Sequence, residues 1–177
     1  MGFLSNLFGG GGERPRPNPT PSVSPKKLDQ AVFLSEKISD MIRDAFFDEE
    51  LIPTGKDPAA FGNDPYMTGF VFGVARDSSK GMGVGIDERD SIVIATATAK
   101  LIFGSMTKSS DPKAAAMFDR GTVNGAKVAR DMADPSTSDG FGLMQSLWGD
   151  YVLYKYASPS FRKSAEFRKI AKASWFD

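Results

Sequence analysis

Two pairs of glycines, each pair four residues apart within an apolar stretch, constrain the fold of this chain more than any other feature. Gly69 and Gly73 lie in the segment Tyr66 to Asp77, and Gly121 and Gly125 lie in a second such segment. Residues four apart share one face of a helix, and glycine costs up to about 1 kcal/mol of helix propensity there. A packing reason is therefore expected, and we interpret each pair as a close helix crossing.

The tetrapeptide Val-Ala-Arg-Asp follows both glycine pairs and ends at Asp77 and at Asp131. The spacing from glycine to tetrapeptide differs by two residues, so we favour chance or convergent packing over an internal repeat. Arg76 and Asp77 could instead meet Arg130 and Asp131 in a buried polar cleft, which is the sharpest small-molecule hypothesis that the sequence offers. Ion pairs at the surface are the simpler alternative.

Helical signals also come before the first glycine pair. Ser24 is a plausible N-cap with Pro25 at the first helical position. One face of this predicted helix carries apolar residues at helical spacing, namely Leu34, Ile38, Met41, Ile42 and Ala45. Acidic residues follow in steps of four on another face, namely Glu36, Asp40, Asp44 and Asp48. Because Lys37 and Arg43 sit among them, we interpret this acidic stripe as a solvated face rather than a metal site.

Further helices are predicted toward the C-terminus. Residues 91–103 are rich enough in β-branched side chains for a strand, but the flanking Asp87 and Gly104 favour a helix. Two more helices are expected, one from Asp111 to about Met132 and one from Phe141 to Tyr156. The glycine-rich segment 80–85 lacks a dinucleotide-binding or Walker pattern, and we expect a loop between helices there.

The first 27 residues cannot build a core. Four large apolar residues, here called the hook, come first: Phe3, Leu4, Leu7 and Phe8. Glycines 9–12 and five prolines follow and form a tether that is not expected to fold. Burial of the hook would gain about 6–12 kcal/mol, but ordering eight residues costs about as much, so we expect weak docking onto a protein partner. The alternatives are an arm without a role and an arm that folds back onto its own domain.

Composition excludes several classes of chemistry. The chain has no histidine and no cysteine, which removes Ser-His-Asp and Cys-His catalysis, histidine-liganded zinc, and disulfides. Carboxylate, lysine, tyrosine or serine chemistry remains open, as does binding of hard metals by oxygen ligands. We assign no catalytic residue, no metal ligand and no cofactor, and an enzymatic role, although open, is the less favoured one.

The net charge of zero conceals an uneven distribution. Residues 1–27 carry +3, residues 28–157 carry −6, and residues 158–177 carry +3. An acidic body argues against nucleic-acid binding, which requires clustered positive charge on the fold itself. The basic segment 158–177 has the pattern of an amphipathic helix, which can lie on an anionic membrane but is expected to pack on the body, for example over the stripe from Glu36 to Asp44.

These observations predict an all-α protein: a compact bundle of five to six helices with a disordered N-terminal arm. The predicted parts are the arm (1–27), a helical domain (28–157) and the basic C-terminal helix (158–177). We expect a cytoplasmic, non-enzymatic interaction or adaptor protein, with peripheral membrane contact through the arm or the C-terminal helix as one variant. The alternative is a small-ligand-binding protein or carboxylate-based enzyme with a pocket between the glycine-containing helices.

Overall fold

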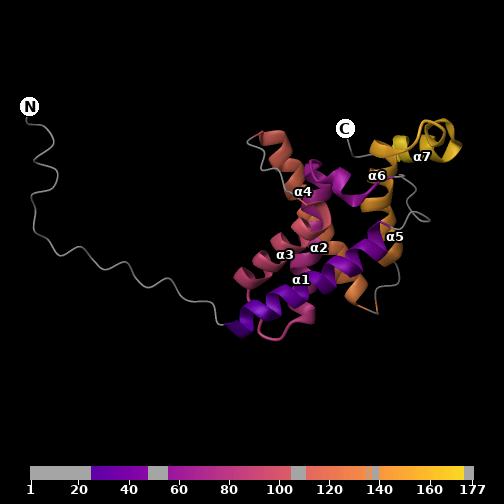
Figure 1. Ribbon diagram of the computed structural model, residues 1–177. Helices are drawn as coiled ribbons and strands as arrows, with labels where there is room; N and C mark the ends of the chain where they lie inside the picture. Colours follow the sequence, from indigo (N-terminus) through magenta and orange to yellow (C-terminus); the bar gives the residue numbers. More distant parts are fainter. Residues whose placement is uncertain (1–24, 48–55, 105–110, 135, 137–139, 174–177) are drawn as a thin grey trace, which may run out of the picture.

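The computed structural model describes residues 25–47, 56–104, 111–134, 136 and 140–173. Within these residues every regular element is helical and no strand occurs, so the predicted all-α fold is confirmed (Figure 1). The hook residues Phe3, Leu4, Leu7 and Phe8 lie outside the described residues, as does the tether up to residue 24. The first helix begins at Pro25, so the last three residues of the 1–27 segment belong to it.

The described chain contains the following elements in order: α1 (Pro25–Phe46), η1 (Pro58–Phe61), α2 (Pro65–Met82), α3 (Glu88–Phe103), α4 (Pro112–Ala133), α5 (Gly140–Met144), η2 (Gln145–Gly149), α6 (Asp150–Tyr156), η3 (Phe161–Lys163) and α7 (Ala165–Ala173). The segments η1 and η3 are 3₁₀ turns, and η2 is a π-helical turn. Because α5, η2 and α6 follow one another without a break, they form one rod. The sequence predicted a single helix at this position but not its π-helical centre.

Aspartates begin three of the helices and the turn η1. The Asp64 carboxylate accepts hydrogen bonds from the first backbone amides of α2, and Asp87 and Asp111 do the same for α3 and α4. Proline follows directly at Pro65 and Pro112, where no backbone donor is lost. Helix α3 starts at Glu88 and ends before Gly104, so residues 91–103 are helical, as predicted.

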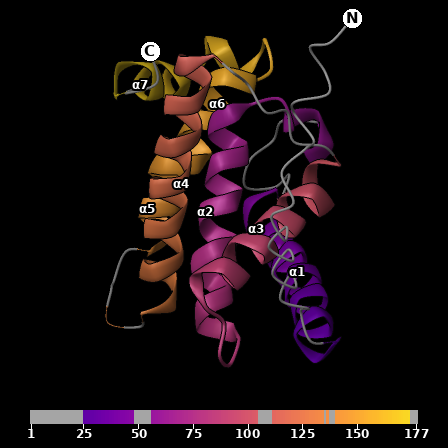
Figure 2. The ribbon, with the colours of Figure 1, turned by 90° about the vertical axis from the view of Figure 1, so that its left-hand side faces the viewer.

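The helices α2 and α4 run side by side in the same direction (Figure 2). Gly69 faces Phe118 near the start of both helices, and Val74 faces Gly125 further along. Helix α3 returns antiparallel to α2 after a tight turn, where Lys80 pairs with Glu88. The predicted loop at 80–85 is therefore correct only for residues 83–85, because α2 continues through Lys80 to Met82.

Helix α1 packs along α3 in the same direction. Lys27 pairs with Asp90 near the start of both helices at 3.0 Å, and Arg43 donates to the carbonyl oxygen of Leu101 near their ends at 2.7 Å. Between these contacts, the Ser35 hydroxyl lies 3.4 Å from the carbonyl oxygen of Ile94. Along this polar seam, the face of α1 that carries Ser35 and Ser39 turns toward α3.

The glycine pairs of α2 and α4 interlock with each other. A β-carbon on Gly73 would lie 2.1 Å from the carbonyl oxygen of Thr122, and one on Gly121 would lie 2.2 Å from that of Tyr66. Gly69 and Gly125 are equally close to backbone carbonyls of the opposite helix, at 2.1 Å. The predicted close helix crossing is therefore confirmed, and both pairs belong to the same crossing.

Aromatic side chains fill the space between this crossing and the rod. Trp148 is fully buried, and its ring centroid lies 4.8 Å from that of Phe70 and 5.7 Å from that of Phe46. The indole nitrogen donates to the carbonyl oxygen of Phe46 at 2.8 Å, which satisfies its polar group inside the core. Trp148 and Tyr151 are both buried, so the segment from Phe141 to Tyr156, predicted as a helix, packs against the core.

The buried face of α1 differs from the prediction at one residue. Leu34, Ile38 and Ile42 are buried, but Met41 remains 38% exposed. The cause is the seam with α3, which draws Ser35 and Ser39 inward and leaves Met41 at the edge of the buried face. This displacement contributes to a groove described below.

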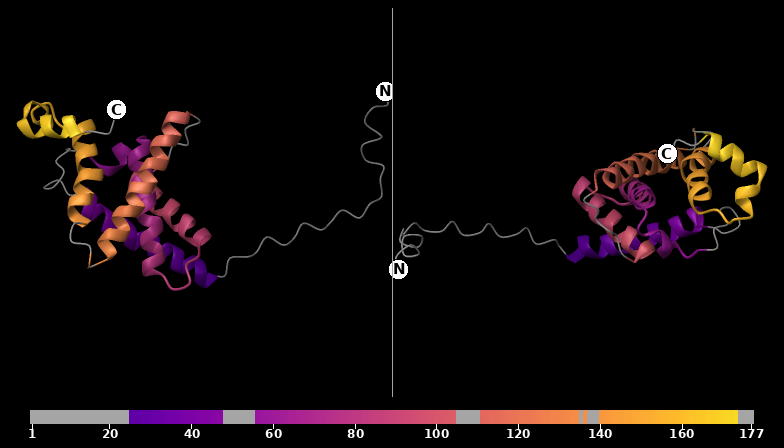
Figure 3. Two further views of the ribbon diagram at one scale, coloured as in Figure 1. Left: turned by 180° about the vertical axis from the view of Figure 1, so that it is seen from behind. Right: turned by 90° about the horizontal axis from the view of Figure 1, so that it is seen from above.

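The C-terminal helix α7 packs against α6 and η3, away from the start of α1 (Figure 3). The rings of Tyr154 and Phe167 stack at 6.1 Å, and Ile170 is buried. Arg162 fixes the connection by donating to the carbonyl oxygens of Lys155 and Ala157. The suggested position over the acidic stripe is therefore wrong, because the short connection after Tyr156 holds α7 beside the rod.

Candidate functional site

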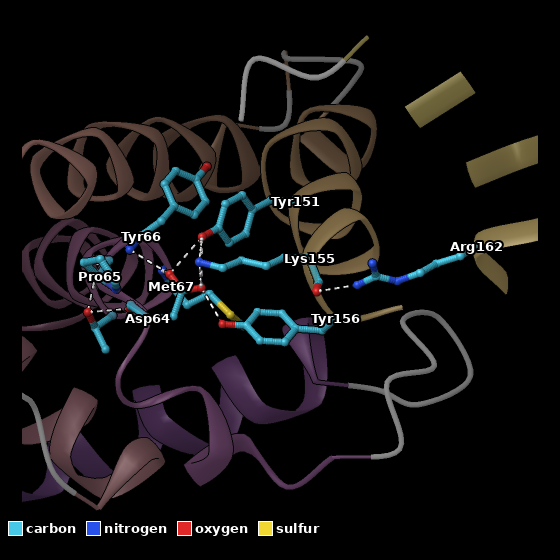
Figure 4. Close-up of polar contacts among 9 residues, drawn as sticks. Asp64, Pro65, Tyr66, Met67, Tyr151, Lys155, Tyr156 and Arg162 are labelled. Carbon is cyan, nitrogen blue, oxygen red and sulfur yellow. Dashed lines mark hydrogen bonds and ion pairs between the residues drawn. The ribbon is translucent and has the colours of Figure 1, made fainter. Parts of the chain in front are cut away.

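Asp64 is the most extensively bonded polar residue in the described part of the chain (Figure 4). Its side chain is fully buried. Oδ1 accepts hydrogen bonds from the backbone amides of Tyr66 and Met67, at 2.9 and 3.2 Å, as the N-cap of α2. The position of Asp64 directly before Pro65 is typical of an N-cap, but no local pattern indicates the partners that approach from the other side.

Three side chains of α6 converge on the same carboxylate. The Tyr151 hydroxyl lies 2.9 Å from both carboxylate oxygens, and the Tyr156 hydroxyl donates to Oδ2 at 2.6 Å. The Lys155 ammonium forms an ion pair with Oδ2 at 2.9 Å. We call Asp64, Tyr151, Lys155 and Tyr156 the Asp64 cluster.

The environment of the Asp64 cluster keeps its phenols protonated. Burial raises the pKa of Tyr151, and the negative charge of Asp64 raises it further. Burial and the hydrogen bond to Asp64 likewise raise the pKa of Tyr156. A phenol acting as a general base needs a pKa near the working pH, whereas the pKa values of these two phenols shift away from it. The contacts of the cluster hold α6 onto the start of α2.

One sequence signal points toward this cluster. Tyr151, Lys155 and Tyr156 are spaced by four and five residues, so they lie on neighbouring parts of one helix face. That spacing marks a polar edge on an otherwise apolar helix. It does not identify Asp64 as the partner, because the two segments are 87 or more positions apart.

The residues of the predicted polar cleft lie near the far ends of α2 and α4. Asp77 accepts from Arg76 at 3.2 Å and from Arg130 at 2.5 Å, so contacts join these three residues. Asp131 follows on α4 and is partly buried. The Asp77 side chain is 11% exposed but that of Arg130 is 61% exposed, so this is an ion pair at the rim rather than a buried cluster.

Beside this ion pair lies an open groove of about 600 Å³, here called the methionine groove. Its lining comes from α1, α2 and α4 and includes Met41, Phe46, Val74, Asp77, Met82, Arg130, Met132 and Asp134. Met41, Met82 and Met132 are 38%, 51% and 53% exposed and form the walls, whereas Phe46 and Val74 are buried at its base. The groove is therefore mainly apolar, with one charged rim.

The methionine groove is not located at the glycines. Backbone contact closes the α2–α4 crossing at Gly73 and Gly125, and the groove opens further along these helices, where α1 also contributes. The sequence placed a hypothetical pocket between the glycine-containing helices; the groove instead lies beyond the glycine pairs and is formed by α1 as well as by α2 and α4.

A second cavity of about 490 Å³ lies between the rod and α7, beside the place where they pack together. Asp150 and Glu166 face it from opposite sides, together with Gln145 and Lys169. Burial raises the pKa of Asp150; the hydrogen bond from Gln145 opposes this shift, and the negative charge of Glu166 adds to it. In the described ranges no group of three acidic, histidine or cysteine side chains is placed to hold a metal ion.

Comparisons of the chain with protein-family models, with curated proteins and with solved structures gave no match. Among the described helices, none combines the length and the apolar character that a membrane crossing requires.

Proposed function

We propose that this chain is a non-enzymatic interaction protein, in which a rigid helical body carries the hook and the hook docks weakly onto a partner protein. The observation that carries this proposal is the contrast between a satisfied interior and an apolar exterior. Buried side-chain polar atoms in the described residues all have hydrogen-bond partners. The carboxylates of Asp64 and Asp77 are both engaged by cationic side chains.

The exterior of the body, in contrast, presents many large apolar side chains. Val32 and Phe33 of α1 are 52% and 57% exposed, and Val93 and Leu101 of α3 are 55% and 48% exposed. Single exposed apolar residues are ordinary, but a concentration on adjacent helices is typical of interaction surfaces. The hook adds four more such residues at the end of a tether.

The experiment that tests this function is a pull-down with the purified chain as bait. In one variant Phe3, Leu4, Leu7 and Phe8 are changed to serine, and in a matched control Ser5→Ala and Asn6→Ala leave the hook apolar. We expect the serine variant to lose a specific partner that the native chain and the control retain. Identical partners for all three chains, with equal melting temperatures, would contradict the proposal.

The C-terminal basic residues support a variant of this proposal in which an anionic membrane provides a second contact. Arg162, Lys163, Arg168, Lys169 and Lys172 are all exposed on η3 and α7. Co-sedimentation with phosphatidylserine vesicles but not with phosphatidylcholine vesicles, lost when Lys169 and Lys172 become glutamine, would support this second contact. Equal sedimentation with both vesicles would exclude it.

A second candidate function rests on the methionine groove, whose volume falls within the range of about 300–1,000 Å³ common for small-molecule sites. Asp77 and Arg130 would supply polar contacts at its rim. Thermal-shift screening with nucleotides, small acids and metal ions tests this function directly. Stabilisation by any of them that Arg130→Ala removes would favour a ligand-binding role over the adaptor.

A further inference from the structure

We propose that the methionine groove is the intramolecular binding site of the hook, so that the arm of the free protein docks onto its own body. This inference deepens the proposed function, because it assigns a resting place to the segment that docks onto a partner. Three observations carry it: the chemistry of the groove, its distance from Pro25, and the charges around it.

The groove has the chemistry of a site for a short apolar helix. Met41, Met82 and Met132 project from three different helices around a buried base that includes Phe46. Methionine side chains are flexible and polarisable, so walls built from them adapt to the shape of an inserted apolar group. The volume of about 600 Å³ accommodates part of the hook, such as one aromatic and one aliphatic residue on the same helix face.

The tether is long enough for the hook to reach the groove. Residues 9–24 connect the hook to Pro25, where α1 begins. Met41 lies on α1 itself, about 24 Å along the helix axis from Pro25 at 1.5 Å per residue. A Gly-rich chain of 16 residues would have a root-mean-square end-to-end distance of about 20–24 Å, whereas the prolines favour an extended polyproline II form that spans up to about 50 Å at about 3.1 Å per residue. The reach of the tether therefore exceeds the distance to Met41, so the hook can dock in the same molecule at a raised effective concentration.

Acidic side chains near the groove, which lie beside the basic Arg43 and Arg130, can pair with the two arginines of the tether. Arg14 and Arg16 follow the glycines of the tether. On the body, Asp44 is exposed one residue before Ala45, which lines the groove, and Asp134 lies at the rim. Hydrogen bonds from Ser136 hold the pKa of Asp134 below its usual range, so its carboxylate is ionised at neutral pH.

Docking within the molecule has a functional consequence. The hook cannot occupy the groove and a partner at the same time. The apparent affinity for the partner is therefore the intrinsic affinity multiplied by the fraction of molecules whose hook is free. The groove is therefore an autoinhibitory site that a tight partner overcomes.

Paramagnetic relaxation tests this directly, because a chain without cysteine takes a single nitroxide label at Asn6→Cys. At helical spacing Asn6 would fall on the face opposite the apolar residues of the hook, so a label at this position leaves those residues unchanged. In a chain with ¹³C-labelled methionine methyls, we expect the signals of Met41, Met82 and Met132 to lose more than half their intensity. Met67, which is buried near the start of α2, fifteen residues or about 22 Å before Met82, and does not line the groove, serves as the internal reference and should retain more of its intensity.

Two controls identify the occupant. The same label in a chain whose four hook residues are serine should leave the groove signals unbroadened. In the second control, two kinds of chain are mixed: one carries the nitroxide but no ¹³C, and the other carries ¹³C-labelled methionine methyls but no nitroxide. This mixture should show no broadening. Broadening in that mixture would assign the groove to the hook of a second copy and overturn the proposal.

The failure of this inference is distinguishable from failure of the proposed function. Uniform or absent broadening of the three groove methionines overturns intramolecular docking, even if the serine variant loses its partner in the pull-down. Selective broadening together with an unchanged set of partners would instead retain the docking site and contradict the adaptor function.

Discussion

The hydroxyl group of Tyr156 lies 2.6 Å from a carboxylate oxygen of Asp64, a residue 92 positions earlier in the chain. This contact joins the end of α6 to the start of α2, the helix at the centre of the bundle. Lys155 pairs with the same oxygen atom. The Asp64 cluster therefore fixes the position of the rod, and with it the support on which α7 packs.

Replacement of Asp64 by alanine is expected to be severe. It removes the N-cap of α2 and leaves Tyr151 and Tyr156 without their buried acceptor. Loss of one partner from a buried ion pair costs about 3–5 kcal/mol. Because the Lys155 side chain is 46% exposed, we expect a loss near the lower end of that range, measured by urea denaturation with Trp148 fluorescence.

Asp111→Ala is the matched control, because Asp111 caps α4 but is exposed. Loss of an exposed cap typically costs about 1 kcal/mol. Equal losses for Asp64→Ala and Asp111→Ala would show that Asp64 acts as a cap alone and that its contacts with α6 contribute no stability.

The tyrosines of the core should titrate abnormally. Burial raises the pKa of Tyr66, Tyr151 and Tyr156 above the ordinary value near 10. The folded state retains these protons when the unfolded chain has lost them, so their contribution to stability is complete below about pH 10 and is lost as the pH rises beyond it. Absorbance near 295 nm should therefore rise later in the folded protein than in the chain held in denaturant.

A variant separates the causes of this tyrosine shift. The negative charge of Asp64 contributes to the raised pKa of Tyr151 and Tyr156. Asp64→Asn should therefore bring part of the absorbance rise to lower pH while the protein is still folded. Identical titration curves for the folded and the denatured native chain would contradict the burial of these phenols.

Two glycines of α2 should respond in opposite ways to alanine. A methyl group at Gly73 meets the carbonyl oxygen of Thr122 at 2.1 Å, which forces the crossing apart, and overpacking of this kind costs about 1–3 kcal/mol. At Gly81 nothing lies within 4 Å, so alanine should gain up to about 1 kcal/mol of helix propensity. Melting temperatures should fall for Gly73→Ala and rise for Gly81→Ala; a rise for both would contradict close backbone contact.

Local signals in the sequence are sufficient for most of the helices. Each Asp-Pro or Asp-Glu start is a capping pattern contained within a few residues, and Asp87 with Gly104 decides that residues 91–103 form a helix. The close approach at Gly69 and Gly73 is also a local signal. Its partner helix is not, because nothing within α2 specifies contact with α4 rather than with another helix.

The features that sequence reasoning missed depend on contacts between distant segments. The local sequence around Asp64 indicates only an N-cap, and its contacts with α6 are apparent only in the folded structure. Met41 follows the apolar spacing of α1, yet it is left at the rim because the serines of α1 face α3. The methionine groove exists only where α1, α2 and α4 diverge, so no single segment encodes it.

Replacement of Asp150 should increase the free energy of unfolding at neutral pH, whereas replacement of Asp64 should lower it. Burial raises the pKa of Asp150, so the folded state binds the proton more tightly than the unfolded chain. Its stabilising contribution is complete below the ordinary pKa near 4 and is lost as the pH rises through the raised value.

At neutral pH the ionised Asp150 also faces Glu166 across the cavity beside α7. Asp150→Asn should therefore raise the urea midpoint at pH 7, and this gain should vanish toward pH 4; Glu166→Gln should reproduce part of it. A lower midpoint for Asp150→Asn at both pH values would mean that the carboxylate stabilises the rod through its bond with Gln145, and that its burial carries no net cost.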